Sequence, residues 1–306
     1  MTVCRSVEEV RDLVVATGLD LAAVDLVIAE ALNEDLGGRG VLAPGAGAGV
    51  DVTSAATIPA AATATGRFVA RRAGVVAGVP VAAYVVATVC ARAGELEIEL
   101  HVADGSSVAV GDVLVTATGN TRALLTAERV ALNLLTLMSG VATATRAWVT
   151  ALAGTDTQVR DSRKTVPGMR MLQKYAVRVG GGVNHRMSLA DMALIKDNHV
   201  IAAGGVVPAY QAVRRAYPEL GVQVEVTSAE QARAVVAAGA DDILLDNMSV
   251  AEMTAVVAEL AGRARFEASG GLTVESAATV ATSGVDYVAV GAITHSAPIL
   301  DIALDL

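Results

Sequence analysis

The sequence predicts an α/β protein whose second part is an incomplete (β/α) barrel of the TIM type. After residue 121, strand-like apolar runs alternate with helical patterns, and the last four runs begin roughly 21–22 residues apart. Such alternation is typical of a parallel sheet, most simply one closed into a barrel. The segment 121–291 is short for eight full βα units. The residues before it mix helices and strands without this repeat.

The first 120 residues are predicted to form an α/β domain of their own, against which the tail 297–306 is expected to pack. Asp20 is a good N-cap for the second of two predicted helices. A Gly/Ala/Pro-rich stretch at 37–50 predicts a flexible loop. In chain order the predicted elements are helices 7–17 and 21–36, strand 66–72, helix 78–92, and strands 95–102 and 112–118.

The barrel domain is predicted to span 121–296. It opens with a long helical pattern over 121–152, which we expect to be interrupted at Ser139-Gly140. Six strands follow, at 158–161, 193–196, 222–226, 242–246, 264–268 and 286–290.

Composition excludes several classes of protein. The net charge of −9 argues against nucleic acid as a general partner. No unbroken apolar run is long enough to span a bilayer, and the N-terminus is charged and amphipathic rather than signal-like, so no membrane partner is expected. Cys4 and Cys90 have no framework spacing, which favours a reducing cytoplasm and two inert thiols.

Positive charge is concentrated in the window 160–199. It contains all three lysines of the chain, Lys164, Lys174 and Lys196, and carries a charge of +5, whereas the remaining residues total −14. Lysine and arginine are not interchangeable where a ligand fixes the geometry. A basic pocket in an acidic protein indicates a polyanionic small-molecule ligand.

Polar residues follow the predicted strands, where active sites of barrels gather. Glu225 and Asp246 could coordinate a hard cation such as Mg²⁺, directly or through a substrate. Ser269-Gly270-Gly271 and Gly291-Ala292 could bring backbone N–H groups to a phosphate.

Three further side chains are candidate ligand contacts. His185 and Arg186 follow three consecutive glycines, so both can point inward. Lys196 could contact the ligand or, alternatively, form a Schiff base as in an aldolase. The role of His295, beside the last candidate phosphate loop, stays open.

The segment DSRKTVPGMRMLQKYAVRVGGGVNHRMSLADMALIKDNHV is similar to the signature of the carboxylating nicotinate-nucleotide pyrophosphorylases, also called quinolinate phosphoribosyltransferases. Supporting matches cover nearly the whole chain: ALNEDLG, DVTSAATIP, LLTAERVALNLL, VEVTS, LLDNMS, SGGLT and GVDYVAVGAITHS. The resemblance implies an N-terminal open α/β sandwich, an incomplete barrel and a homodimer or higher oligomer. It also implies conversion of quinolinate and phosphoribosyl pyrophosphate to nicotinate mononucleotide, pyrophosphate and CO₂, with Mg²⁺, in NAD biosynthesis.

The resemblance also implies roles for individual residues. Arg163, His185, Arg186 and Lys196 would line the quinolinate pocket, and Arg129 would join them from the partner subunit. Ser162 keeps the hydroxyl of the family's DTRK motif, here DSRK. Lys164 would lie near the pyrophosphate, Glu225 and Asp246 would serve the ribose hydroxyls and Mg²⁺, and the segments Ser269-Gly270-Gly271 and Gly291-Ala292 would hold the 5′-phosphate. Lys164, Glu225 and Asp246 form the expected catalytic set.

Two departures from the family pattern accompany these matches. Ala268 stands where the family often has Ser, and Gly38–Val50 resembles an insertion. Neither removes a presumed ligand. A related barrel transferase for another heteroaromatic acid, and a catalytically silent sensor of a phosphate ligand, remain the alternatives.

Overall fold

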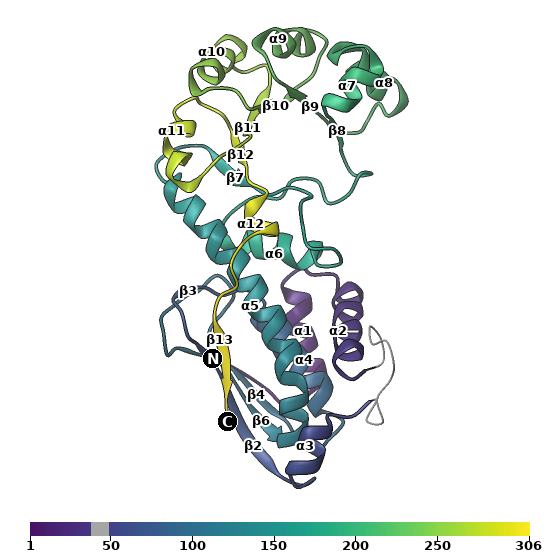
Figure 1. Ribbon diagram of the computed structural model, residues 1–306, viewed down its shortest axis with the longest axis vertical. Helices are drawn as coiled ribbons and strands as arrows, with labels where there is room; N and C mark the ends of the chain where they lie inside the picture. The colour runs from purple at the N-terminus through teal and green to yellow at the C-terminus, as the bar shows by residue number, and fades with distance from the viewer. Residues whose placement is uncertain (38–48) are drawn as a thin grey trace. The chain divides into compact units, whose positions relative to one another are not determined.

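The computed structural model describes residues 1–37 and 49–306 (Figure 1). The chain divides into two compact units, one made of Met1–Thr143, Pro167–Gly180 and Ala297–Leu306, the other of Ala144–Val166 and Gly181–Ser296. The boundary predicted at residue 120 falls between a strand and the helix that follows it. Residues 38–48 of the predicted loop and insertion lie outside the described residues.

The first unit contains a five-stranded antiparallel sheet in the order β1-β4-β6-β2-β13. Its strands are β1 (Thr2–Cys4), β2 (Thr63–Ala70), β4 (Glu97–Leu100), β6 (Val113–Asn120) and β13 (Ile302–Asp305). The three strands predicted here are confirmed, and the C-terminal tail adds β13 beside β2. A separate two-stranded ribbon consists of β3 (Gly74–Val75) and β5 (Ser107–Val108).

Helices of this unit begin at residues whose side chains accept the free backbone N–H groups of the first turn. Ser6 and Glu9 form a capping box, and the Asp20 carboxylate accepts the Ala22 N–H as predicted. The helices are α1 (Val7–Ala16), α2 (Leu21–Asp35), α3 (Val52–Thr57), α4 (Val79–Cys90) and α6 (Arg170–Gly180). Cys4 and Cys90 are free and buried, and burial raises the pKa of Cys90 to about 12, which fits an inert thiol.

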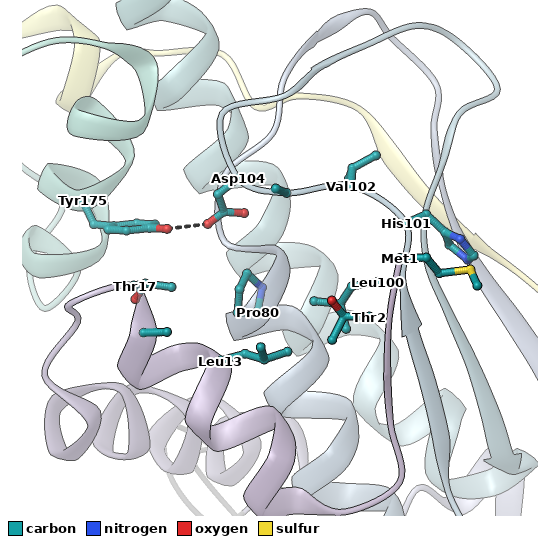
Figure 2. A pocket seen from close by; sticks show the side chains of 12 residues that line it. Met1, Thr2, Leu13, Thr17, Pro80, Leu100, His101, Val102, Asp104 and Tyr175 are labelled. Carbon is teal, nitrogen blue, oxygen red and sulfur yellow. Dashed lines mark hydrogen bonds between the residues drawn. The ribbon is translucent and has the colours of Figure 1, made fainter.

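Asp104 joins α4 to α6. Its carboxylate accepts the N–H groups of Gly78 and Val79, at 2.8 and 2.9 Å, and so caps α4. The Tyr175 hydroxyl of α6 donates to it at 2.6 Å (Figure 2). Burial raises the pKa of Asp104, while its three donors oppose that rise. Asp104 lines the cavity of about 320 Å³ drawn in Figure 2, and its carboxylate already has hydrogen-bond donors from the protein.

Helix α5 (Thr121–Ala151) is continuous, so the predicted interruption at Ser139-Gly140 is wrong. The two residues serve packing instead. The Ser139 hydroxyl accepts the Ala77 N–H and donates to its carbonyl. A Cβ on Gly140 would lie 2.2 Å from the Pro298 carbonyl oxygen. The glycine thus admits the C-terminal tail against the helix.

Among the described helices, only α5 is long and apolar enough to cross a membrane by composition, although it lacks an unbroken apolar run. Its most apolar stretch is 67% buried within the fold, which identifies α5 as a core helix.

Replacing Gly140 with alanine is expected to lower the free energy of unfolding by about 1–3 kcal/mol, because the added Cβ must displace backbone. Urea denaturation would measure the change. Without the tail contact, the same substitution would stabilise the helix by roughly 0.5–1 kcal/mol, so the sign of the effect decides between the two.

The second unit contains a six-stranded parallel sheet in the order β7-β12-β11-β10-β9-β8. All six predicted strands are confirmed: β7 (Gln158–Arg160), β8 (Ala193–Ile195), β9 (Val222–Val226), β10 (Asp242–Asp246), β11 (Arg265–Ser269) and β12 (Tyr287–Ala289). Strands β7 and β8 do not pair with each other, so the sheet forms an open barrel.

Helices cover the outside of the strand arc in Figure 1. They are α7 (Asp197–Ala203), α8 (Val206–Ala216), α9 (Ala229–Ala237), α10 (Val250–Leu260) and α11 (Ala277–Ala281); short helices η1 (Val274–Ser276) and α12 (Ala292–His295) follow β11 and β12. Residues alternate along each strand, with apolar side chains such as Val224, Ile243 and Phe266 fully buried. The intervening positions carry the polar side chains of the site.

Candidate active site

One cavity of about 260 Å³ lies at the C-terminal ends of the barrel strands. Its lining includes eight of the predicted substrate-binding residues: Ser162, Arg163, Lys164, His185, Arg186, Lys196, Ser269 and Gly291. Asp161, Leu194, Leu244, Glu267 and Ala289 complete it. Four of the lining residues are lysine or arginine and two are acidic, so the cavity is suited to an anionic ligand.

Lys164 is held by contacts to its backbone and by space beside its side chain. The Ser162 hydroxyl accepts the Lys164 N–H at 3.1 Å, and the Thr294 hydroxyl donates to the Lys164 carbonyl at 2.7 Å. A Cβ on Gly291 would lie 2.9 Å from Cδ of Lys164. Gly291 therefore leaves the room that the lysine side chain occupies.

Asp161 organises the loop after the triple glycine. It accepts the Asn184 side-chain amide and the His185 N–H, each at 2.7 Å. Asp161 is fully buried. Because it follows β7 directly, it ties this loop to the barrel, and it thereby presents His185 and Arg186 to the cavity.

Arg163 and Arg186 bring two guanidinium groups into one cavity. Burial, and then the charge of Arg163, lower the pKa of Arg186. Arg186 donates to the Met192 carbonyl at 2.9 Å. The buried Nε of Arg163 has no hydrogen-bond partner in the described part of the chain. Two neighbouring cations with an unused buried donor favour binding of a carboxylate or phosphate.

Lys196 lies at the end of β8 and pairs with Glu225 of β9, with Nζ 2.5 Å from Oε2. The Glu225 side chain is only 10% exposed. The Lys196 nitrogen is thus engaged with a carboxylate, an arrangement that gives no support to the aldolase alternative.

Asp246 and the glycine loop lie at the ends of β10 and β11. The Asn247 side chain donates to Asp246 at 2.7 Å, and the Asn247 N–H donates to the Ser269 carbonyl at 2.9 Å. Asn247 has a positive φ of 54°, and a Cβ on Gly270 would lie 2.2 Å from its Oδ1. Gly270, itself at φ 99°, is therefore required for this close approach.

Not every predicted site residue lines the barrel cavity. Asp246, Gly270, Gly271 and Ala292 follow its strands without lining it, and Glu225 reaches it through Lys196. Arg129 belongs to the other compact unit, where it is 62% exposed and lines a cavity with Asp35 and Asp51. The glycine loop is followed by the short η1, whose Ser276 N–H is taken by the Thr273 hydroxyl.

Sequence reasoning missed a buried polar network below the cavity. Arg160 donates to Glu267 at 2.8 Å and stacks over the Tyr287 ring, 3.6 Å from its centroid. Gln223 donates to both Glu267 and Asp242. Burial raises the pKa of Glu267 and of Asp242. The available signal was a polar residue between two apolar neighbours within a strand, as for Gln223 in VQVEV and Glu267 in RFEAS.

Two models of known protein domains match this chain. Residues 51–139 match the N-terminal domain of quinolinate phosphoribosyl transferase, and residues 141–305 match its C-terminal domain. This chain belongs to the quinolinate phosphoribosyltransferase family. The two matches extend from residue 51 to residue 305, reach into both compact units and include every residue of the barrel cavity.

Relatives of this family align along most of the chain. The nicotinate-nucleotide pyrophosphorylase [carboxylating] of Mycobacterium leprae is 53% identical over 261 residues, which is 84% of this chain and 92% of the relative. The probable enzyme of the same name from Bacillus subtilis is 42% identical over 208 residues, 68% of this chain and 72% of the relative.

Solved structures of the family share the fold. NadC from Streptococcus pyogenes superposes with a TM-score of 0.86 at 36% identity, covering 94% of this chain and 97% of that one. The nicotinate-nucleotide pyrophosphorylase from Francisella tularensis gives 0.84 at 33% identity, covering 93% and 96%. Both parts of the predicted fold class, the N-terminal α/β sandwich and the incomplete barrel, are confirmed.

Proposed function

We propose that this chain transfers the phosphoribosyl group of phosphoribosyl pyrophosphate to quinolinate, releasing pyrophosphate and CO₂ and yielding nicotinate mononucleotide for NAD biosynthesis. The observation that carries the proposal is the cationic barrel cavity in a chain that matches both domains of the quinolinate phosphoribosyltransferase family. Quinolinate is a dianion near neutral pH, and its cosubstrate carries a phosphate and a pyrophosphate. Several cations are needed to hold both without mutual repulsion.

The quinolinate carboxylates are proposed to bind Arg163 and Arg186. The buried Nε of Arg163 lacks a hydrogen-bond partner among the described residues, and burial together with the neighbouring charge of Arg163 lowers the pKa of Arg186. A dicarboxylate would accept charge-assisted hydrogen bonds from both side chains. Lys196 and His185 complete the lining on this side.

The sugar donor is proposed to extend toward the other strand ends. Lys164 would neutralise the pyrophosphate, and Glu225 and Asp246 would face the ribose. The loops Ser269-Gly270-Gly271 and Gly291-Ala292 would hold the 5′-phosphate through backbone N–H groups.

Mg²⁺ is proposed to enter with the sugar donor. The described residues contain no group of three or more His, Cys, Asp or Glu side chains suited to a metal. Two carboxylates on neighbouring strands, Glu225 and Asp246, fit an ion that keeps most of its ligands from substrate oxygens and water. When bound, the ion would neutralise charge on the departing pyrophosphate.

The chemistry then follows from charge. The pyridine nitrogen attacks the anomeric carbon as the bond to pyrophosphate breaks, and Lys164 stabilises the negative charge that develops on the leaving group. The ring nitrogen becomes cationic. The bond from the ring to the 2-carboxylate breaks, CO₂ leaves, and the electron pair remaining on the ring carbon takes up a proton. Positioning and desolvation suffice for this step, so no covalent enzyme intermediate is needed.

We further propose a cytoplasmic homodimer or higher oligomer in which Arg129 serves the partner's site. Its exposed side chain, on a motif that resembles the family's, supports this role. Two buried free thiols agree with a reducing compartment.

A turnover assay tests the reaction. Purified protein would be given Mg²⁺, phosphoribosyl pyrophosphate and either quinolinate or nicotinate, and nucleotide and CO₂ would be followed. Nicotinate mononucleotide from quinolinate alone, with equimolar CO₂, is the expected result. A folded protein that binds the sugar donor but uses neither acid would contradict the proposal and favour another heteroaromatic acid or the sensor.

A further inference from the structure

Gln223 lies where three polar side chains meet beneath the cavity. Its amide nitrogen donates to Asp242 Oδ1 at 2.8 Å and to Glu267 Oε2 at 2.7 Å. Its amide oxygen lies 2.8 Å from Nε2 of His185. Gln223 and Glu267 are fully buried, so the amide of Gln223 has no access to water as an alternative partner.

Chemistry fixes which way the Gln223 amide points. Glu267 Oε2 also accepts an N–H of Arg160, and the second oxygen of Asp242 accepts one of Arg265, at 3.1 Å. Each carboxylate is therefore an acceptor that needs a donor from Gln223. A flipped amide would place its oxygen against both carboxylates, which is repulsive. The amide oxygen must face His185.

The orientation of Gln223 in turn selects the tautomer of His185. An amide oxygen can only accept, so the ring nitrogen opposite it, Nε2, must carry the proton. The other nitrogen, Nδ1, accepts the backbone N–H of Arg186 at 2.7 Å. That contact uses the lone pair that the Nε2–H tautomer leaves on Nδ1, so it is compatible with the tautomer that Gln223 selects.

We propose that Gln223 is a positioning residue which holds His185 as its Nε2–H tautomer and thereby fixes the backbone that carries Arg186. Gln223 does not line the cavity, whereas His185 and Arg186 do. Its effect reaches a ligand through the partners that do line the cavity, and the path to Arg186 runs through His185. The kinetic part of this inference rests on the proposed function, because it assigns Arg186 to quinolinate.

Nuclear magnetic resonance of the imidazole nitrogens tests the tautomer without any turnover. The protein with ¹⁵N-labelled histidine has four such side chains, and the His185 signals are assigned by their loss in His185→Gln. The expected wild-type spectrum at neutral pH has a protonated Nε2 and an unprotonated Nδ1. A protonated Nδ1 would overturn the proposal, whether or not the protein turns over quinolinate.

Gln223→Met tests the cause. It keeps the side-chain length but removes the acceptor, so the single tautomer should be lost and the quinolinate KM should rise about tenfold, while the KM for phosphoribosyl pyrophosphate changes less than about twofold. Arg265→Ala is the matched control, since it removes a partner of Asp242 from the same network without touching Gln223 or His185. It should keep the wild-type tautomer and quinolinate KM.

Two further outcomes of these variants would overturn the proposal. One is an unchanged Nε2–H tautomer in a folded Gln223→Met protein. The other is an equal rise of both KM values in Gln223→Met and Arg265→Ala, which would mean that the network only supports the fold. If Gln223→Met does not fold, the wild-type spectrum still decides.

Discussion

Replacing Lys164 with alanine is expected to lower kcat by about 10²–10³-fold, the usual cost of removing one donor that stabilises developing charge. The reason is the proposed place of the ammonium group beside the departing pyrophosphate. Lys164 is fixed through its backbone by Ser162 and Thr294, and its side chain runs past Gly291. Steady-state kinetics with saturating quinolinate and phosphoribosyl pyrophosphate would measure the loss.

Lys164→Arg provides the matched comparison. It keeps the charge but adds a planar group where Gly291 leaves room for a single chain of methylenes. Activity between that of the wild type and Lys164→Ala would support a point charge held in a fixed position. Full activity in Lys164→Ala, with circular dichroism showing an intact fold, would remove Lys164 from the catalytic set.

Arg186→Ala is expected to raise the quinolinate KM by about 10–100-fold, since it removes a charge-assisted hydrogen bond to a carboxylate. The KM for phosphoribosyl pyrophosphate should change less than about twofold, because Arg186 is assigned to the other substrate. Initial rates at varied quinolinate would measure the effect. Arg263→Ala, at an exposed arginine of the same unit, serves as a control and should leave both constants unchanged.

An unchanged quinolinate KM in Arg186→Ala would refute the pocket assignment. The opposite result, a raised KM for the sugar donor alone, would assign a phosphate of that donor to Arg163 and Arg186 in place of quinolinate. Isothermal titration of quinolinate would then show whether the dicarboxylate binds elsewhere.

The barrel was predictable because its strands repeat one simple pattern. In segments such as VQVEV and DILLD, apolar residues on the helix-facing side alternate with mostly polar residues on the inner side, and a helix follows each strand after a short loop. The continuity of α5 was not predictable from its own residues. Ser139 and Gly140 resemble a break locally, and only the packing of Ala77 and Pro298 against them gives another reason for small side chains.

The candidate site likewise has residues that the sequence predicted and residues that it did not. Arg163, Lys164, Arg186 and Lys196 stood out because the window 160–199 carries a charge of +5 in an otherwise acidic chain and contains all three lysines, and the structure gathers these four residues on one cavity. Gln223 and Glu267 carried no such signal, since one buried polar residue within an apolar strand has many explanations. Their importance follows from the side chains to which they form hydrogen bonds, and those side chains are distant in the sequence.

The path of the chain has a consequence for any attempt to dissect this protein. It passes from one compact unit to the other at residues 143–144, 166–167, 180–181 and 296–297, so no single cut releases an independent module. A barrel fragment spanning residues 144–296 would retain α6 but lose Asp104, leaving the Tyr175 hydroxyl and the apolar face of that helix uncovered. Such a piece should aggregate when expressed alone, which makes point substitution in the intact chain the practical route to its chemistry.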